Sequence, residues 1–268
     1  DGVNDAPSLK KASIGVGMGI TGTDVTKEAA DIIVTDDSFA TIVIAVEEGR
    51  KIFKNIQKTI NFLFASNFAE VMSLLLALII FPELTFLLPL QILFVNLITD
   101  SLPAMALGHE TAEKNIMAKP PRKSTDNLFS KGVGLSIFLQ GFFQTLIVVS
   151  VFAIGNHFAG NAAASTMAFF TLNLIQVFFI FSVRTNNSIF KSNLFANKWL
   201  AISILAIIII LGLFAFTGLG ALIGLVSLNY KMWLTVLGCS FLILPINEIY
   251  KAVYKKIKTN KANKNKIK

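Results

Sequence analysis

The stretch LLPLQILFVNLITDSLPAMALG, residues 87–108, carries the pattern on which the fold of this chain depends. It is almost entirely apolar, yet Asn96, Thr99 and Asp100 interrupt it at helical spacing, and Pro103 follows them. An apolar segment of about 20 residues is long enough to cross a bilayer as a helix. A carboxylate inside such a segment is costly and usually faces a bundle interior, where it has a function. The stretch therefore predicts a membrane helix that presents polar groups to an internal site.

The rest of the chain contains five more apolar blocks of similar length. Its composition, 54% hydrophobic and 15% charged, is too apolar for an ordinary soluble domain. The blocks predict a mainly α membrane protein, which excludes a soluble phosphatase. Its six-helix transmembrane domain, residues 60–250, would have spans at 60–81, 86–107, 132–154, 165–183, 199–219 and 232–250.

Basic residues collect in alternate gaps between the blocks. The segments 1–59, 108–131, 184–198 and 251–268 contain every Lys and Arg except Lys231. Because this bias marks the cytoplasmic side of a membrane, we expect both termini in the cytoplasm. The net charge of +8 is then a feature of topology, and we expect no nucleic-acid partner. We expect the basic tail, 251–268, to be frayed and solvated or to lie on anionic lipid headgroups.

The first span carries Asn67 and Glu70, which are three residues apart and therefore on one helical face. Only Pro82 to Pro89 separate this span from the second, so we expect an antiparallel hairpin with Glu70 and Asp100 at comparable depth. Pro103 would free a backbone carbonyl by interrupting the helical hydrogen bonds.

These side chains form an all-oxygen set of the kind that hard cations such as Ca²⁺ prefer. The set has no His or Cys, which argues against zinc or copper. Asn173 and Gln176 of the fourth span would add oxygens from a third helix. The alternative is interhelical hydrogen bonding, which we favour for a lone Asn or Gln but not for two acids with three polar neighbours. The remaining polar span residues are interpreted as packing or interfacial groups: Gln91, Gln140, Gln144, and Glu248 paired with Lys251.

Residues 1–37 form the soluble part. We expect a short strand at 12–19, a helix at 26–30 and a second strand at 32–34. Two short strands and one short helix are too few to form a hydrophobic core. We therefore expect the segment to complete a domain whose other parts lie outside residues 1–37. From Ser38 the apolar spacing becomes helical and predicts a stalk helix, 38–59, that runs into the first span.

Two motifs in the soluble part suggest phosphate chemistry. Asp1, Asn4 and Asp5 in DGVNDAP suit Mg²⁺ beside a phosphate, although such a run is more often an ordinary turn. Glycines at 17, 19 and 22 match the dinucleotide fingerprint, but they fall at the end of a strand with no room for a full sheet, so we expect no dinucleotide cofactor.

Together these pieces resemble the P-type cation-transporting ATPases, in particular the sarcoplasmic-reticulum-type calcium pumps and their bacterial relatives. The resemblance lies in DGVNDAP at 1–7, SNFAEV at 66–71, the stretch at 87–108 and IMAKPPR at 116–122. It implies that residues 1–37 are the last part of a haloacid-dehalogenase-like α/β phosphorylation domain.

The resemblance also implies roles for single residues. Asp1 would be the Mg²⁺ carboxylate, with Asn4 and Asp5 supporting the phosphorylated site. The ion ligands would be Asn67, Glu70, Asn96, Thr99 and Asp100. Gln176 stands where two-site calcium pumps of the family have Glu, which removes a carboxylate. Asn96 favours the calcium-type pattern, because sodium/potassium pumps usually carry Asp there.

The implied function is ATP-driven export of Ca²⁺ through an aspartyl-phosphate cycle. The alternatives are a pump for Na⁺ or Mn²⁺, or a passive channel or carrier. The chain has no DKTGT, TGE loop, nucleotide-binding domain or PEGL helix. We therefore expect a fragment that is inactive alone, with ATP bound mainly by an N-terminal part of the same pump. Membrane lipid is the other expected partner, without an obligate subunit. The Lys-, Asn- and Ile-rich sequence favours a bacterial plasma membrane.

Overall fold

The computed structural model describes residues 1–112, 115–122, 127–130, 132–185, 188–189 and 196–267. Side chains of residues 258, 259 and 261–267 are outside this description. Parts of the predicted cytoplasmic segments 108–131, 184–198 and 251–268 therefore lie outside the described residues. The chain divides into two compact units, one of residues 1–53 with 112–121 and one of residues 54–111 with 122–268.

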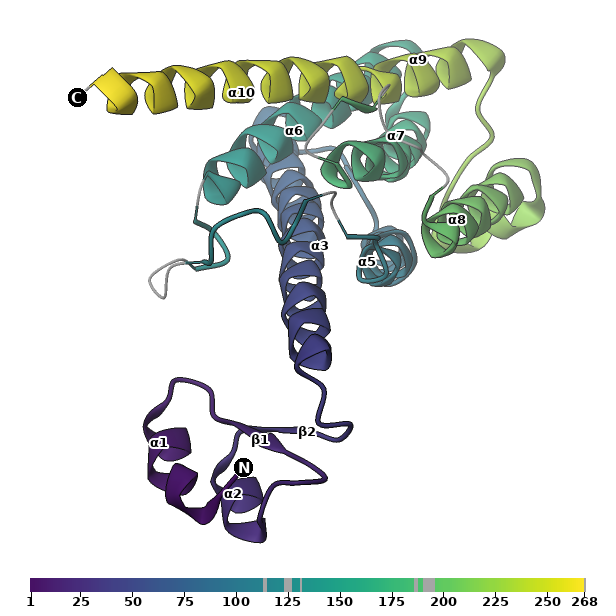
Figure 1. Ribbon diagram of the computed structural model, residues 1–268. Helices are drawn as coiled ribbons and strands as arrows, with labels where there is room; N and C mark the ends of the chain where they lie inside the picture. The colour runs from purple at the N-terminus through teal and green to yellow at the C-terminus, as the bar shows by residue number, and fades with distance from the viewer. Residues whose placement is uncertain (113–114, 123–126, 131, 186–187, 190–195, 268) are drawn as a thin grey trace. The chain divides into compact units, whose positions relative to one another are not determined.

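The first unit contains a β–α–β arrangement preceded by a short helical segment (Figure 1). Strands β1 and β2 pair in parallel, with Val16 opposite Ile32 and Met18 opposite Val34. Parallel strands need a crossover connection, which here contains a single short helix, α2. The elements are η1 (Val3–Asp5), α1 (Ala6–Lys11), β1 (Val16–Met18), α2 (Asp24–Ala29) and β2 (Ile32–Val34).

The predicted strand–helix–strand order is confirmed, with two corrections. The strand expected at 12–19 is only Val16–Met18, because Gly15 bonds to Asp31 instead: its N–H donates to the carboxylate at 2.8 Å. The turn expected at DGVNDAP is instead the beginning of helical structure, since Pro7 occupies the first turn of α1, where its missing N–H costs nothing.

Asp37 orders the loop that follows β1. Its carboxylate accepts the backbone N–H groups of Ile20 and Thr21 at 2.8 and 2.7 Å, and the Thr21 hydroxyl at 2.7 Å. These hydrogen bonds lower the pKa of Asp37 from 3.8 to about 2. The largest effect comes from the Ile20 N–H and the next largest from the Thr21 hydroxyl. The stabilisation is therefore complete above about pH 4 and is lost as the pH falls toward 2.

The second unit is helical. Helix α3 (Phe39–Ile80), whose first residues belong to the first unit, is continuous over 42 residues, which confirms the prediction of one long helix. The others are α4 (Pro89–Phe94), η2 (Val95–Asp100), α5 (Ser101–Leu107), α6 (Val133–Ala159), α7 (Asn161–Val183), α8 (Lys198–Phe216), η4 (Gly218–Ile223), α9 (Tyr230–Phe241) and α10 (Ile243–Ile267).

Six helical stretches of the described chain are long and apolar enough to cross a membrane, as predicted. They are Phe39–Ile80, Pro89–Leu107, Val133–Ala159, Asn161–Val183, Lys198–Phe216 and Tyr230–Ile257. The chain is therefore a mainly helical integral membrane protein. The assignment of its segments to domains stays a prediction.

Helix α7 is the centre of the membrane unit. It packs against α6, α9, α10 and η2, and in Figure 1 α6 and α9 lie beside it. In its most apolar stretch 83% of the residues are buried, against 50% or less in the other five candidate spans. The α3 side of this core is closed by Phe62, whose ring stacks on Phe179 of α7 at 6.0 Å. A residue of α7 is thus in a position to contact several other helices.

The last span departs from the prediction of one helix at 232–250. The helix is interrupted at Leu242, because Pro245 has no N–H to donate to the carbonyl four residues earlier. After this break, α10 stays helical to Ile267. The expectation of a frayed tail is therefore wrong for the backbone up to that residue.

Helices α3 and α6 approach each other most closely at Gly141. A Cβ atom on Gly141 would lie 2.6 Å from Cδ1 of Phe68 and 2.9 Å from the carbonyl oxygen of Ala65. One turn later, the Thr145 hydroxyl donates to the carbonyl of Ala69 at 3.3 Å. Small residues permit such close contact between membrane helices, and this contact supports the turn of α3 that carries Glu70.

We predict that Gly141→Leu destabilises the protein by about 1–3 kcal/mol, because the new side chain overpacks the α3–α6 crossing. The measurement is the midpoint of thermal unfolding in detergent. Gly134→Leu in the same helix is the matched control, since a Cβ on Gly134 has no neighbour within 4 Å. Equal midpoints for the two variants would contradict the crossing.

Candidate functional site

Two buried carboxylates come together where α3 packs against the second span. Glu70 of α3 is 4% exposed and Asp100, at the end of η2, is 2% exposed. The Asn96 amide nitrogen lies 3.0 Å from each carboxylate oxygen of Glu70 and donates to them. The predicted hairpin is therefore present, and it places Glu70 beside the polar groups of the second span.

The carboxylate of Asp100 has no compensating group. Neither of its oxygens has a hydrogen-bond partner in the part of the chain that the structure describes. It is also close enough to Glu70 for the two to repel each other electrostatically. A buried, unpaired carboxylate is costly, and buried charges are normally paired or bound to a metal ion. Two buried carboxylates with this surplus of negative charge suit the binding of a cation.

The second span is not a regular α-helix at this site. Residues Val95–Asp100 form a π-helical segment, η2, between α4 and α5. Such segments are rare and frequently occur at functional sites. Just after this segment, the hydroxyl of Ser101, the first residue of α5, donates to the carbonyl of Asn96 at 2.9 Å, five residues earlier. The sequence predicted an irregularity caused by Pro103. The altered segment lies in the turns just before that proline and includes Thr99, whose carbonyl Pro103 has no N–H to bond.

Helix α7 adds groups from a third direction. The Thr99 hydroxyl lies 2.9 Å from the side-chain oxygen of Gln176 and 2.9 Å from the carbonyl of Val95, and it has one proton to donate. The Gln176 side-chain nitrogen is buried without a partner among the described residues. Asn173 donates to the carbonyl of Phe169, and its own side-chain oxygen is likewise unpaired there. Gln176 is thus joined to the second span, as the sequence predicts.

Asn67 belongs to the same face of α3, one turn before Glu70. Its side chain is half-buried and makes no hydrogen bond with the described residues. In this state Asn67 is therefore available but not engaged. No group of three or more His, Cys, Asp or Glu suited to a metal occurs in the described ranges, so a cation here must rely on amide and hydroxyl oxygens besides the two carboxylates.

Two of the groups interpreted as packing or interfacial residues have the partners that this interpretation requires, whereas Gln140 and Gln144 each keep one buried side-chain atom unpaired among the described residues. The Gln91 amide is fully buried and donates to the carbonyl of Ile223 at 3.1 Å, which joins the start of α4 to η4. Glu248 and Lys251 form the predicted ion pair, at 3.2 Å.

The oxygen atoms that the DGVND motif could offer to a metal lie at and just before the short helical segment η1. The Asp5 carboxylate accepts the Gly2 N–H at 2.9 Å, whereas Asp1 and Asn4 are exposed. Two carboxylates and an amide oxygen fit Mg²⁺, which is usually held by one or two carboxylates and keeps several waters. The carbonyl of Asp1 accepts the N–H of Thr23 at 3.0 Å, which fastens the motif to the beginning of α2.

Comparison with known proteins identifies the family of the chain. The profile of the family described as "Cation transporting ATPase, C-terminus" matches residues 84–253, more than half of the chain. The chain belongs to the cation-transporting ATPases. The matched range includes the π-helical segment with Asp100 and the whole of α7.

Individual relatives have a narrower description. A protein of Bacillus subtilis (strain 168) described as a calcium-transporting ATPase is 41% identical over 90% of this chain and 27% of its own length. A "Calcium-transporting ATPase 1" of Bacillus cereus is 40% identical over 95% of this chain and 31% of its own length. An endoplasmic reticulum-type calcium-transporting ATPase of Arabidopsis thaliana is 48% identical over 58% of this chain and 14% of its own length. The chain spans about three tenths of the two bacterial ATPases.

Sequence reasoning missed a second buried polar network in this ATPase chain. Glu110 and Arg184 form a salt bridge of 2.8 Å, and each side chain is only 7% exposed. Asn197, which caps α8, donates to the same Glu110 carboxylate at 3.1 Å and to the carbonyl of Ala106 at 2.9 Å. Asn55 of α3 donates to the carbonyl of Glu110 at 2.8 Å. The network ties α3, α7 and α8 to the end of α5.

These residues lie outside the apolar spans or at their ends, where hydrophobic spacing gives no signal. The one available signal is an acidic residue, Glu110, just after a membrane span and before a basic segment. Of the helices that contribute to the polar site, the network thus joins α3 and α7 to the end of α5.

We predict that Arg184→Met destabilises the protein by about 3–5 kcal/mol, because it leaves the buried charge of Glu110 uncompensated. Thermal unfolding of the purified protein in detergent measures the loss. The double variant Glu110→Leu/Arg184→Met should recover much of it, since both charges are then gone. A single variant as stable as the parent would show that the salt bridge is not needed.

Proposed function

We propose that this chain is the C-terminal, cation-binding part of an ATP-driven pump that exports Ca²⁺ through an aspartyl-phosphate cycle. The observation that carries the proposal is the Asp100 carboxylate, buried beside Glu70 with neither oxygen paired among the described groups. The relatives described as calcium-transporting ATPases support Ca²⁺ as the transported ion.

The donor set suits a hard divalent cation. Ca²⁺ takes six to eight oxygen ligands, and carboxylates neutralise its charge. Its ligands would come from α3, η2 and α7: Asn67, Glu70, Asn96, Thr99, Asp100 and Gln176. In the structure the Asn96 amide donates to both oxygens of Glu70. An arriving cation would replace this N–H donor, and Asn96 would then turn its oxygen toward the ion.

Gln176 makes this site less acidic than one with Glu at that position. Its oxygen accepts from Thr99, so it provides a neutral ligand. We propose one strong cation site formed around Glu70 and Asp100, with Gln176 contributing an uncharged oxygen.

The soluble unit would contribute to the phosphorylation site. Asp1 would hold Mg²⁺, which neutralises charge on the transferred phosphate, with Asn4 and Asp5 supporting the turn. The parallel pair β1–β2 would belong to a haloacid-dehalogenase-like sheet. Ile32 and Ile33 of β2 are each 46% exposed, which supports a further protein surface against this strand. ATP would be bound by other parts of the intact pump.

Coupling would depend on α3. One continuous helix contains both Phe39, five residues after β2, and Glu70. Movement of the phosphorylation domain would shift α3, separate Glu70 from Asp100 and release the ion to the far side, as in other transitions between two rigid arrangements. We place the pump in a bacterial plasma membrane with both termini in the cytoplasm, and the proposal requires neither a partner subunit nor nucleic acid.

We predict that ATP-driven uptake of labelled Ca²⁺ into inverted vesicles is abolished by Glu70→Gln, since the substitution removes a charged ligand. Glu83→Gln is the matched control, because Glu83 is exposed in the turn between the first two spans. Competition with Na⁺ and Mn²⁺ tests the choice of ion. ATPase activity that another cation stimulates, without Ca²⁺ uptake, would preserve the pump and contradict Ca²⁺. Flux without ATP would indicate a channel or carrier.

We also predict that residues 1–268 expressed alone show no vanadate-sensitive ATP hydrolysis, because the chain contains no DKTGT sequence to accept the phosphate. The measurement is phosphate release by the purified chain in detergent, with the full-length pump as the positive control. Activity of the isolated chain would contradict the proposed division of labour.

A further inference from the structure

The end of α10 is the most basic part of the chain. Residues 251–268 contain eight Lys and no Asp or Glu. The backbone is helical up to Ile267, so these lysines lie on a helical continuation of the last candidate span, Tyr230–Ile257. A cluster of lysines immediately beyond a membrane span is attracted to anionic lipid headgroups.

Two tyrosines mark the depth at which this basic segment begins. Tyr250 and Tyr254 are half-buried, and their rings stack at 6.0 Å. The Tyr254 hydroxyl lies against Gly132, where an added Cβ would be only 2.9 Å from it. Gly132 immediately precedes α6, so Tyr254 is level with the end of another membrane span. Tyrosine is enriched at this level, where its hydroxyl reaches the headgroups.

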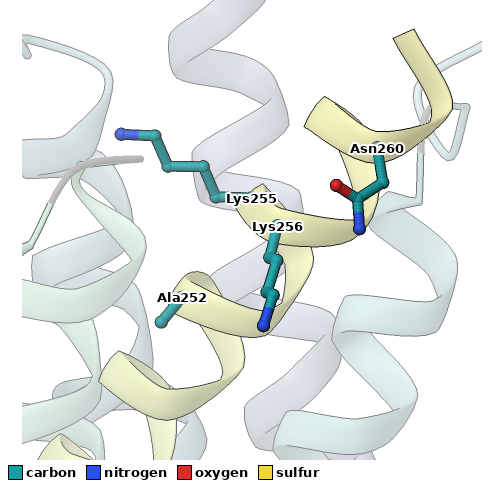
Figure 2. Close-up of a pocket in the computed structure, with 4 residues that line it drawn as sticks. All are labelled: Ala252, Lys255, Lys256 and Asn260. Carbon is teal, nitrogen blue, oxygen red and sulfur yellow. The ribbon is translucent and has the colours of Figure 1, made fainter. Parts of the chain in front are cut away.

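The residues just beyond Tyr254 form a small open hollow of about 420 Å³, lined by Ala252, Lys255, Lys256 and Asn260. Figure 2 shows Lys256 and Asn260 on one side of α10, with Ala252 one turn before Lys256, whereas Lys255 points the other way. Because the side chain of Ala252 is only a methyl group, it leaves space beside the side chain of Lys256. Lys256 and Asn260 are both exposed and present N–H donors to this space.

We propose that this hollow binds the headgroup of an anionic phospholipid. The ammonium of Lys256 and the amide of Asn260 would donate to the phosphate, and the acyl chains would continue past Ala252 along α10. A lipid is favoured over a soluble anion because the hollow lies directly beyond the tyrosine level, where phosphodiesters of the bilayer are already concentrated. This site is separate from the cation site of Glu70 and Asp100, and it does not depend on the transported ion.

The test is binding of short-chain phosphatidylglycerol to the purified full-length protein, measured by native mass spectrometry. Lys256→Gln should weaken binding about fivefold, since a lysine near an anionic membrane surface contributes about 1 kcal/mol. Lys256→Arg should keep the affinity of the parent, because it preserves the charge. Phosphatidylcholine has the same phosphodiester but no net charge, so it should bind the parent more weakly and lose less affinity in Lys256→Gln.

Lys231→Gln is the matched control, because it removes one exposed lysine from the other end of the last span. Thermal unfolding confirms that each variant folds. The proposal is overturned if Lys256→Gln leaves phosphatidylglycerol binding unchanged, or if Lys231→Gln weakens it equally, which would indicate an effect of net charge alone. Displacement of the lipid by millimolar inorganic phosphate would instead identify a site for a soluble anion.

Discussion

The membrane unit is organised around a buried carboxylate that has no partner of its own. Asp100 lies within an apolar bundle beside a second acid, Glu70, and neither of its oxygens is hydrogen-bonded to a described group. Such an arrangement is unfavourable without a counter-charge. It persists because close packing surrounds it: α3 is held against α6 at Gly141, and α7 packs against four other elements. The stability of the bundle thus maintains a local arrangement that favours binding of a cation.

The same packing explains how groups distant in sequence form one site. The π-helical segment carries Asn96 to Glu70 of α3 and Thr99 to Gln176 of α7, so each contact joins a different helix pair. Beyond the end of α5, the Glu110–Arg184 salt bridge and Asn197 join the ends of α5, α7 and α8. Movement of α3 would act on Glu70 directly, and it would also strain the hydrogen bond by which Asn55 joins α3 to the buried network.

Much of this arrangement was predictable from the sequence. Long apolar blocks reveal membrane spans, and polar residues inside them are conspicuous because lipid excludes them. The hairpin between Glu70 and Asp100 followed from the short connection at Pro82–Pro89. The π-helical geometry of Val95–Asp100 was not predictable, because apolar spacing over six residues does not distinguish it from an α-helix. The Glu110–Arg184 pair was also missed, since it forms between segments 74 residues apart that have no periodic pattern. The break at Leu242 could have been anticipated from Pro245.

The central claim is that Asp100 binds the transported ion itself. Equilibrium binding of labelled Ca²⁺ to the purified full-length protein, without ATP, tests it most directly because it requires no turnover. The account predicts that high-affinity binding by the parent is lost in Asp100→Asn, while the thermal midpoint without Ca²⁺ is unchanged or raised, since the unpaired charge is removed. Undiminished Ca²⁺ binding in a folded Asp100→Asn variant would contradict the account.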